Sequence, residues 1–335
     1  MKTIAAALCI AGAIFVFSSE AHAGTLYSDL GEAKESIEAL HVEGTGLVNE
    51  SGESVRLKGV STHGLAWFPD YVNQDAFSTL RTDWRANVVR LAMYTQEYGG
   101  YCTVSSSEKK NLIKLIDKGV KAATLNGMYV IIDWHILSDG NPNTHKKAAK
   151  KFFRKMAKKY ASYPNVIYEV CNEPNGTSWK SIRKYASSVV KVIRKYDSDA
   201  VVVVGTNTWS QDVDDVIGHE LNYDNVMYSL HFYAGTHGDY LREKAQKALD
   251  AGVPLFITEC GISDASGNGG VYKSAGNKWM KFINKNGLSF VAWNLSNKDE
   301  SSALIKSSCS KTSGWKKKNL SPSGKWFRKK IRKQT

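Results

Sequence analysis

Two glutamates occupy positions at which a carboxylate could take part in catalysis. Glu173 lies in the segment 169–174 (EVCNEP), and Glu259 lies in the segment 256–261 (FITECG). Each follows an apolar, β-branched stretch and precedes a loop with Gly or Pro, which predicts a carboxylate at the C-terminal end of a strand. Two carboxylates that face each other across a cleft can hydrolyse a glycosidic bond, because one protonates the leaving oxygen while the other acts on the anomeric carbon.

The elements that must position these glutamates form a regular pattern. Eight short apolar runs, most of them continuously apolar like parallel strands covered on both faces, cover residues 55–60, 88–93, 129–134, 166–171, 200–205, 226–232, 254–258 and 288–293. Amphipathic stretches suited to crossover helices lie between them, among others at 109–125, 179–196, 240–251 and 275–286. The pattern predicts a single-domain α/β fold, a (β/α)8 TIM barrel, in which chemistry takes place at the C-terminal strand ends. A doubly wound sheet would show a glycine-rich phosphate turn after its first strand, and the sequence has none.

Further polar side chains share the inward face of the predicted strands, because side chains along a strand alternate with a period of two. They are Arg90, Tyr94, Asp133, His135, His231 and Tyr233, with Trp293 at the end of the eighth run. Each alone could be structural, but burying so many polar groups without a function would cost much desolvation free energy. Glu169 shares the parity of Glu173 but lies roughly 13 Å deeper, so we expect a paired interior carboxylate there.

These motifs, in this order, resemble glycoside hydrolase family 5, also called cellulase family A, and in particular its bacterial-type secreted endo-β-1,4-glucanases. The matching segments are 57–64 (LKGVSTHG), 89–94 (VRLAMY), 133–135 (DWH), 172–174 (NEP), 231–234 (HFYA), 258–259 (TE) and 293–298 (WNLSNK). The resemblance covers nearly all of the chain after its first residues. It implies a cellulase that hydrolyses internal β-1,4-glucosidic bonds of cellulose and soluble β-glucans with retention of configuration, and that needs no cofactor. No spacing in the sequence is typical of a metal site.

The resemblance also implies a role for each residue around the two glutamates. Glu173 becomes the proton donor that must be protonated when sugar binds, and Glu259 becomes the nucleophile that must stay ionised. Arg90 and Tyr233 would hold Glu259, and Asn172 would bind the 2-hydroxyl of the sugar. His135 and His231 would orient the substrate and the acid. A cis peptide bond between Trp293 and Asn294 is also implied.

A groove for the polysaccharide would surround these residues. The resemblance implies that it is built from His63, Trp67, Tyr94, Trp209 and Trp293, with Lys298 and Glu300 holding hydroxyl groups of a sugar beyond the cleaved bond. The Lys-x-Glu arrangement resembles the cellulases of the family more than its mannanases.

The chain begins with a predicted secretory signal peptide. Lys2 is followed by the apolar residues 4–17 and by the small-residue cleavage site Ala21-His22-Ala23. We therefore expect residues 1–23 to be removed, and residues 24–335 to form one catalytic domain without a carbohydrate-binding module. About 14 apolar residues are too few to span a bilayer, so we expect an extracellular protein without a membrane anchor, acting as a monomer.

Charge and cysteine content leave some alternatives open. The net charge of +13 makes nucleic acid or an anionic surface worth weighing. However, the basic stretch 146–159 has the periodicity of a solvated helix face, and the tail 316–333 resembles a basic closing helix, so we expect no nucleic-acid partner. Retention on acidic polysaccharide is a secondary hypothesis. Cys102 and Cys309 both fall in predicted loops and could form a disulfide in an exported protein.

Two rival functions follow from the same residues. The first keeps the mechanism and changes the substrate to mannan, xyloglucan or mixed-linkage β-glucan. The second is a noncatalytic carbohydrate-binding barrel, whose sequence would lack Glu173 or Glu259, and this chain has both.

Overall fold

The computed structural model describes residues 37–333 and contains a closed barrel of eight parallel strands. The order of neighbouring strands is β10-β11-β4-β5-β6-β7-β8-β9. Their bounds are β4 (Lys58–Thr62), β5 (Val88–Tyr94), β6 (Tyr129–His135), β7 (Val166–Glu169), β8 (Val202–Gly205), β9 (Val226–Tyr233), β10 (Leu255–Gly261) and β11 (Phe290–Leu295). The predicted (β/α)8 TIM barrel is confirmed, and all eight predicted strands overlap an observed one.

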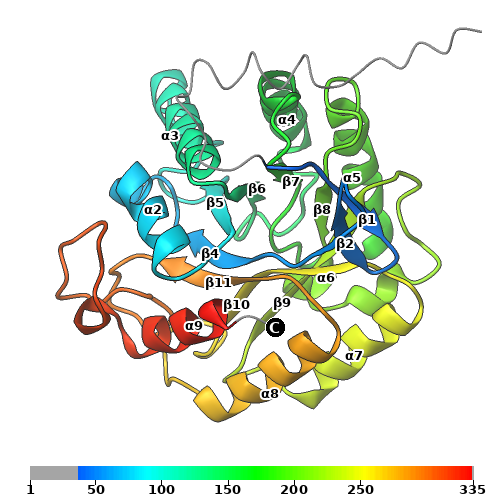
Figure 1. Ribbon diagram of the computed structural model, residues 1–335. Helices are drawn as coiled ribbons and strands as arrows, with labels where there is room; N and C mark the ends of the chain where they lie inside the picture. Colours follow the sequence, from blue (N-terminus) through cyan, green and yellow to red (C-terminus); the bar gives the residue numbers. More distant parts are fainter. Residues whose placement is uncertain (1–36, 334–335) are drawn as a thin grey trace, which may run out of the picture.

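Helices surround the barrel, with α3, α4 and α5 on one side and α7, α8 and α9 on the other (Figure 1). The long helices are α2 (Gln74–Thr82), α3 (Ser106–Leu125), α4 (Lys146–Tyr160), α5 (Trp179–Ile193), α7 (Asp239–Asp250), α8 (Lys273–Lys285) and α9 (Pro322–Arg332). Shorter elements are η1 (Pro69–Tyr71), α6 (Asn207–Ser210), η2 (Val213–Val216) and η3 (Lys317–Asn319). Helix α3 begins at a capping box, in which Ser105 and Glu108 satisfy each other's backbone N–H groups.

The amphipathic pattern of α4 places its basic residues in solvent as predicted. Phe152, Phe153 and Met156 are buried against the barrel, whereas Lys151 and Lys155 are exposed. The tail helix α9 differs from the prediction because it begins at Pro322 rather than near residue 316. Proline suits the first turn of a helix, where its missing N–H would have no helical partner.

A small antiparallel sheet at the N-terminal strand ends was not predicted. It consists of β1 (Leu40–Glu43), β2 (Gly46–Asn49) and β3 (Ser54–Val55). The predicted first run, residues 55–60, was wrong in its bounds, because Val55 pairs with Leu47 of β2 and the barrel strand starts at Lys58. Leu40 and Leu47 join an apolar cluster with residues from the barrel interior, so the sheet covers that end of the barrel.

Two bulges interrupt the strands that lead to the cleft. On β10, Phe256 pairs with Ser229 and Glu259 pairs with His231, so three steps on β10 oppose two on β9. A bulge changes the parity of a strand and can turn a side chain toward the other face. The interruption therefore allows Phe256 and Glu259, which are an odd number of residues apart, to lie on the same inner side. β11 shows a similar shift between Ala292 and Leu295.

The prediction that Glu173 is the last residue of a strand is wrong, because the strand ends four residues earlier. Strand β7 ends at Glu169. Beyond it, the chain is held to neighbouring strands by isolated backbone hydrogen bonds, such as the one that Gly205 N donates to Cys171 O at 3.1 Å.

The possible disulfide is absent, since Cys102 and Cys309 are both free thiols. The predicted signal peptide lies outside the described residues. Within residues 37–333, no helix has the length and apolar character needed to cross a bilayer.

Candidate active site

The two glutamates come together at the C-terminal end of the barrel. One oxygen of Glu173, one oxygen of Glu259 and one ring nitrogen of His231 lie within 4.8 Å of one another. Retaining glycoside hydrolases place their two carboxyl groups about 5 Å apart, whereas inverting enzymes leave room for a water molecule at about 6.5–9.5 Å. The observed spacing therefore fits a direct attack by one carboxylate on the sugar.

Glu259 is held in a buried and cationic environment. Its Oε2 lies 3.1 Å from Nη1 of Arg90, and its Oε1 accepts a 2.6 Å hydrogen bond from the hydroxyl of Tyr233. Burial and the charge of Glu259 raise the pKa of Tyr233 well above its usual value. Tyr233 therefore keeps its proton, and Glu259 accepts two hydrogen bonds, one from Arg90 and one from Tyr233.

Arg90 is the centre of the buried charge network. It is fully buried and contacts Glu169 at 2.6 Å, Asp133 at 3.1 Å and the Asn172 Oδ1 at 2.6 Å. Burial alone would raise the pKa of Glu169, but Arg90 and His231 lower it to about 2. Glu169 is thus an ionised interior partner of Arg90, which confirms the prediction that it is paired.

Glu173 is more exposed than Glu259 and has a different partner. Its Oε1 lies 3.0 Å from Nδ1 of His231, whose Nε2 lies 2.9 Å from the hydroxyl of Thr258. Burial would lower the pKa of His231, but the nearby carboxylates of Glu169 and Glu173 raise it to about 9. The charged form of His231 is therefore favoured, and in that form both ring nitrogens can donate, one to Glu173 and one to the Thr258 hydroxyl.

His135 differs from His231 because it is neutral. Burial and the nearby charge of Arg90 lower the pKa of His135 to about 3. Its Nδ1 lies 2.5 Å from Asp133, which leaves Nε2 to accept from the Asn172 amide at 3.2 Å. Asn172 is in turn fixed by Arg90, so this chain of bonds sets the direction of the side chain next to Glu173.

Aromatic rings line the cleft above the carboxylates. The cleft has a volume of about 290 Å³, and its lining includes ten of the predicted site residues: His63, Trp67, Tyr94, His135, Glu173, Tyr233, Glu259, Trp293, Lys298 and Glu300. Trp293 lies within the register shift of β11, between Ala292 and Leu295, and stacks on His135 with ring centroids 5.2 Å apart. The peptide bond between Trp293 and Asn294 is cis, as the resemblance implied.

A polar pair lies at one end of the cleft. Lys298 Nζ contacts Glu300 Oε2 at 2.7 Å, and Asn294 and Ser302 both donate to Glu300 Oε1. Burial would raise the pKa of Glu300, but these hydrogen bonds lower it. Burial lowers the pKa of His63 to about 3, so His63 is a neutral neighbour of this pair.

Comparison with known proteins identifies the family. The model of the cellulase family, described as glycosyl hydrolase family 5, matches residues 48–299. The chain belongs to glycosyl hydrolase family 5. It is similar to Endoglucanase A of Butyrivibrio fibrisolvens, with 48% identity over 86% of this chain and 67% of that protein. Endoglucanase N of Pectobacterium atrosepticum is 49% identical over 88% of this chain and 65% of its own length. This chain therefore spans about two thirds of the length of these curated relatives.

Solved structures place this family 5 chain among cellulase catalytic domains. Cellulase Cel5C_n has a TM-score of 0.85 and 42% identity, covering 91% of this chain and 95% of its own. The catalytic domain of Thermobifida fusca endoglucanase Cel5A, in complex with cellotetraose, has a TM-score of 0.82 and 35% identity, over 92% of this chain and 99% of its own. The resemblance inferred from the sequence is confirmed.

Four predicted residues of this family 5 site do not line the cleft itself. Arg90, Asn172 and His231 lie directly behind the lining, in contact with the two glutamates. Trp209 is outside it, 43% exposed, and its backbone N–H donates to Pro174 O at 3.0 Å. Trp209 thus belongs to the surface beside the Glu173 loop.

Part of the lining was missed by sequence reasoning. Leu137 and the segment Ala265, Ser266 and Gly267 also face the cleft. The segment follows β10, as loops at a barrel mouth do, but its small residues carry no chemical signal. Only its position after Glu259 could have pointed to it.

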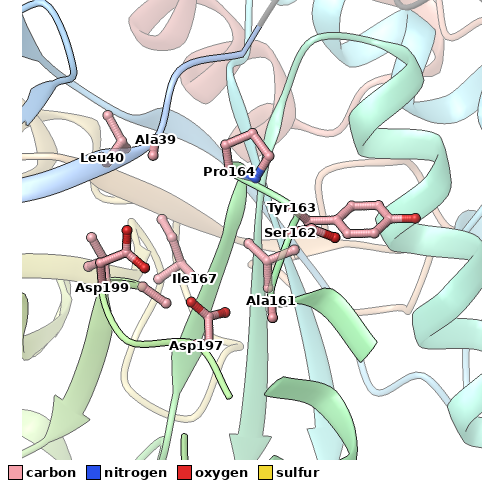
Figure 2. Close-up of a pocket in the computed structure, with 12 residues that line it drawn as sticks. Ala39, Leu40, Ala161, Ser162, Tyr163, Pro164, Ile167, Asp197 and Asp199 are labelled. Carbon is pink, nitrogen blue, oxygen red and sulfur yellow. The ribbon is translucent and has the colours of Figure 1, made fainter. Parts of the chain in front are cut away.

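A second hollow lies at the opposite end of the barrel (Figure 2). It has a volume of about 150 Å³ and is lined by Asp197, Asp199 and apolar residues near the starts of β7 and β8. Asp197 accepts a 2.9 Å hydrogen bond from Tyr168, and burial raises the pKa of Asp197 to about 6. The lining has two carboxylates but neither an Arg nor a His, so it lacks the groups that distinguish Glu173 from Glu259.

Proposed function

We propose that this chain is a secreted, retaining endo-β-1,4-glucanase in which Glu259 is the nucleophile and Glu173 the acid and base. The observation that carries the proposal is the close approach of two carboxylates with unequal partners. Glu259 accepts hydrogen bonds from the Arg90 guanidinium and the Tyr233 hydroxyl, which orient it as a nucleophile. Glu173 is the carboxylate closer to solvent, with a side chain that is 12% exposed, as a group that exchanges protons requires.

In the first step, Glu259 attacks the anomeric carbon while Glu173 protonates the departing glycosidic oxygen. The bond to the leaving sugar breaks, and an ester bond to Glu259 forms. When Glu259 forms the ester it loses its negative charge, and its hydrogen bond with Tyr233 weakens. The Tyr233 hydroxyl can then turn toward the sugar ring. Asn172, which Arg90 and His135 hold directly behind the cleft lining, is the proposed partner of the sugar 2-hydroxyl.

In the second step, Glu173 is a carboxylate and accepts a proton from water, which attacks the anomeric carbon and releases Glu259. Two inversions return the product to its original configuration. His231 remains hydrogen-bonded to Glu173 through both steps and keeps its carboxyl group oriented. Positioning of this kind contributes by holding the reacting groups in a near-attack geometry.

The proposed substrate follows from the shape and polarity of the cleft. Trp293 offers a flat apolar surface on which a pyranose ring can stack, and Trp67 is 36% exposed near the same mouth. Lys298 and Glu300 provide a donor and an acceptor for neighbouring hydroxyls. A cleft open to solvent admits an internal segment of a polymer, which supports endo cleavage of β-1,4-glucan. Trp209, outside the lining, is proposed as a stacking residue for a sugar farther from the cut.

Export is part of the same proposal. Cellulose is an extracellular polymer, and the predicted signal peptide, residues 1–23, would deliver the enzyme to it. The same proposal includes a monomeric catalytic domain over residues 24–335.

Hydrolysis of a substrate panel tests the proposal. Residues 24–335 would be assayed on hydroxyethylcellulose, mixed-linkage β-glucan, xyloglucan and mannan, beside Glu259→Gln and the control Asp199→Asn from the opposite end of the barrel. We expect cleavage of the β-1,4-glucans by wild type and control, and none by Glu259→Gln. Faster hydrolysis of mannan or xyloglucan would assign one of these polymers as the substrate instead. Activity of Glu259→Gln equal to wild type would refute the role of Glu259.

The stereochemistry of the product gives an independent check of the mechanism. We expect the first product seen by NMR to carry the β configuration, because the carboxylates are too close to hold a water molecule between them and the sugar. An α product would contradict double displacement even if the enzyme cleaved cellulose.

A further inference from the structure

The positive charge of this protein is concentrated at one end of the chain. Residues 301–335 contain 11 of the 45 Lys and Arg residues and no Asp or Glu. The first 300 residues therefore hold 34 basic and all 32 acidic residues, a net charge of +2. Nearly all of the net charge of +13 comes from the last tenth of the sequence, which includes α9.

Helix α9 presents this charge in a groove on the outside of the barrel. The helix packs between α8 and the end of α2, since Trp326 contacts the α8 backbone at Gly276 and Arg328 binds Asp83. The groove has a volume of about 470 Å³, and Leu320 is its one apolar lining residue. Its other lining residues are Lys317, Lys325, Arg328, Lys329, Arg332 and Lys333.

Among the residues that the structure describes, the lysines of the groove have no acidic partners. Arg328 and Arg332 are both engaged by Asp83. Within residues 37–333, no carboxylate lies at ion-pair distance from Lys317, Lys325, Lys329 or Lys333, whereas Lys159 of α4 is paired with Asp117. Four exposed ammonium groups thus share one groove, where their mutual repulsion favours a bound polyanion.

The groove lacks the groups by which proteins usually recognise nucleic acid. Arginine binds phosphate or carboxylate in a bidentate way, and both arginines here are already occupied by Asp83. Single-stranded nucleic acid also requires exposed aromatic rings for base stacking, and the nearby Trp315 and Trp326 are buried. What remains is a row of lysine ammonium groups, which can each meet one carboxylate of a polymer.

We propose that the groove of Lys317, Lys325, Lys329 and Lys333 binds an acidic polysaccharide, a chain of uronic acid units. None of these lysines lines the catalytic cleft. The site is therefore independent of the proposed hydrolytic function and would hold the protein on a polyuronate while the cleft remains open to a neutral glucan. Exposed charges act over about 10 Å at 0.1 M salt, so binding is expected to weaken steeply as salt is added.

A pair of charge-matched variants tests the site. The groove variant carries Lys317→Gln, Lys325→Gln, Lys329→Gln and Lys333→Gln. The control carries Lys147→Gln, Lys151→Gln, Lys155→Gln and Lys158→Gln, which removes four exposed charges from α4. Each protein would be bound to polygalacturonate on agarose and to unmodified agarose, and eluted with NaCl. Hydrolysis of hydroxyethylcellulose and the unfolding temperature would show that each variant is folded.

We expect the groove variant to bind polygalacturonate about tenfold or more weakly at low salt, with a smaller dependence on salt, and the α4 variant to remain near wild type. A third variant with Arg at the four groove positions should bind like wild type. Equal losses in the groove and α4 variants would mean that net charge alone is responsible and would overturn the site. Tighter binding of wild type to single-stranded DNA than to polygalacturonate would overturn the choice of ligand.

Discussion

The two ends of the barrel are built from the same strands, but one end buries charged side chains and the other buries apolar ones. At the C-terminal end, Arg90, Glu169 and Glu259 form a buried network of charges beneath an open cleft. At the N-terminal end, Leu57 and Phe256 belong to an apolar cluster that the β1–β3 sheet covers. Burying charges costs desolvation free energy that their pairing offsets only in part, whereas apolar burial stabilises the fold directly. One end therefore supplies catalysis and the other supplies stability.

Strand β10 contributes one residue to each end of the barrel, and the two residues are only three positions apart. Phe256 lies in the apolar cluster, and Glu259 lies in the cleft after the bulge. Variants of these two residues should therefore separate activity from stability, and they are the most direct way to test the comparison.

The largest expected effect is on activity. Glu259→Gln removes the proposed nucleophile and should lower kcat by at least roughly 10³-fold, as loss of a catalytic nucleophile does elsewhere. The free energy of unfolding should stay within about 1 kcal/mol of wild type or rise, because one of three carboxylates around Arg90 becomes neutral. Rates on hydroxyethylcellulose and urea unfolding would measure both. A loss of several kcal/mol with Gln would mean that Glu259 is chiefly structural.

The next effect is on stability. Phe256→Ala removes a fully buried ring from the covered end and should cost about 3–5 kcal/mol of unfolding free energy. Its kcat/KM, measured where the protein is fully folded, should stay within about twofold of wild type. Phe256→Leu is the milder control and should lose less stability. A large fall in kcat/KM with Phe256→Ala would show that the bulge transmits packing from one end to the other.

The sequence predicted the catalytic end better than the covered end. Arg90, His135 and His231 were placed from strand parity alone, because long apolar strands keep a period of two. The β1–β3 sheet was missed because its strands have two to four residues, too few for a periodic signal. The bulge of β10 could not be seen either, since it depends on pairing with β9 and not on the residues of β10 alone.

Other differences have local causes. Trp209 was expected in the groove, but Thr208, Trp209 and Ser210 all have positive φ angles, between 54° and 58°. Three successive non-glycine residues in the left-handed region are rare, and no sequence pattern indicates them. The possible disulfide between Cys102 and Cys309 could not be decided from spacing, because it required the distance between two loops.

A third effect concerns pH at the catalytic end. The pKa of His231 is about 9 in the folded protein and 6.5 ordinarily. The charged form is therefore favoured by folding, and its contribution is fully present below about pH 6.5 and lost as pH rises through 9. We expect a loss of about 3 kcal/mol across this window, measured by urea unfolding. His231→Asn should flatten this decline, and an unchanged slope in the variant would assign it to another group.

The smallest effect concerns pH at the covered end. Burial raises the pKa of Asp197 from 3.8 to about 6, with Tyr168 as its hydrogen-bond donor. Folding favours the protonated form, so the contribution of Asp197 to stability is fully present below about pH 4 and declines by about 2–3 kcal/mol as pH rises through 6. Asp197→Asn keeps an acceptor for Tyr168 and should remove the decline, while the exposed Asp199→Asn should retain it. Since the window for Asp197 ends below that for His231, each end of the barrel should lose stability in its own pH range. A decline that persists in Asp197→Asn would mean that the two ends are not separable by titration.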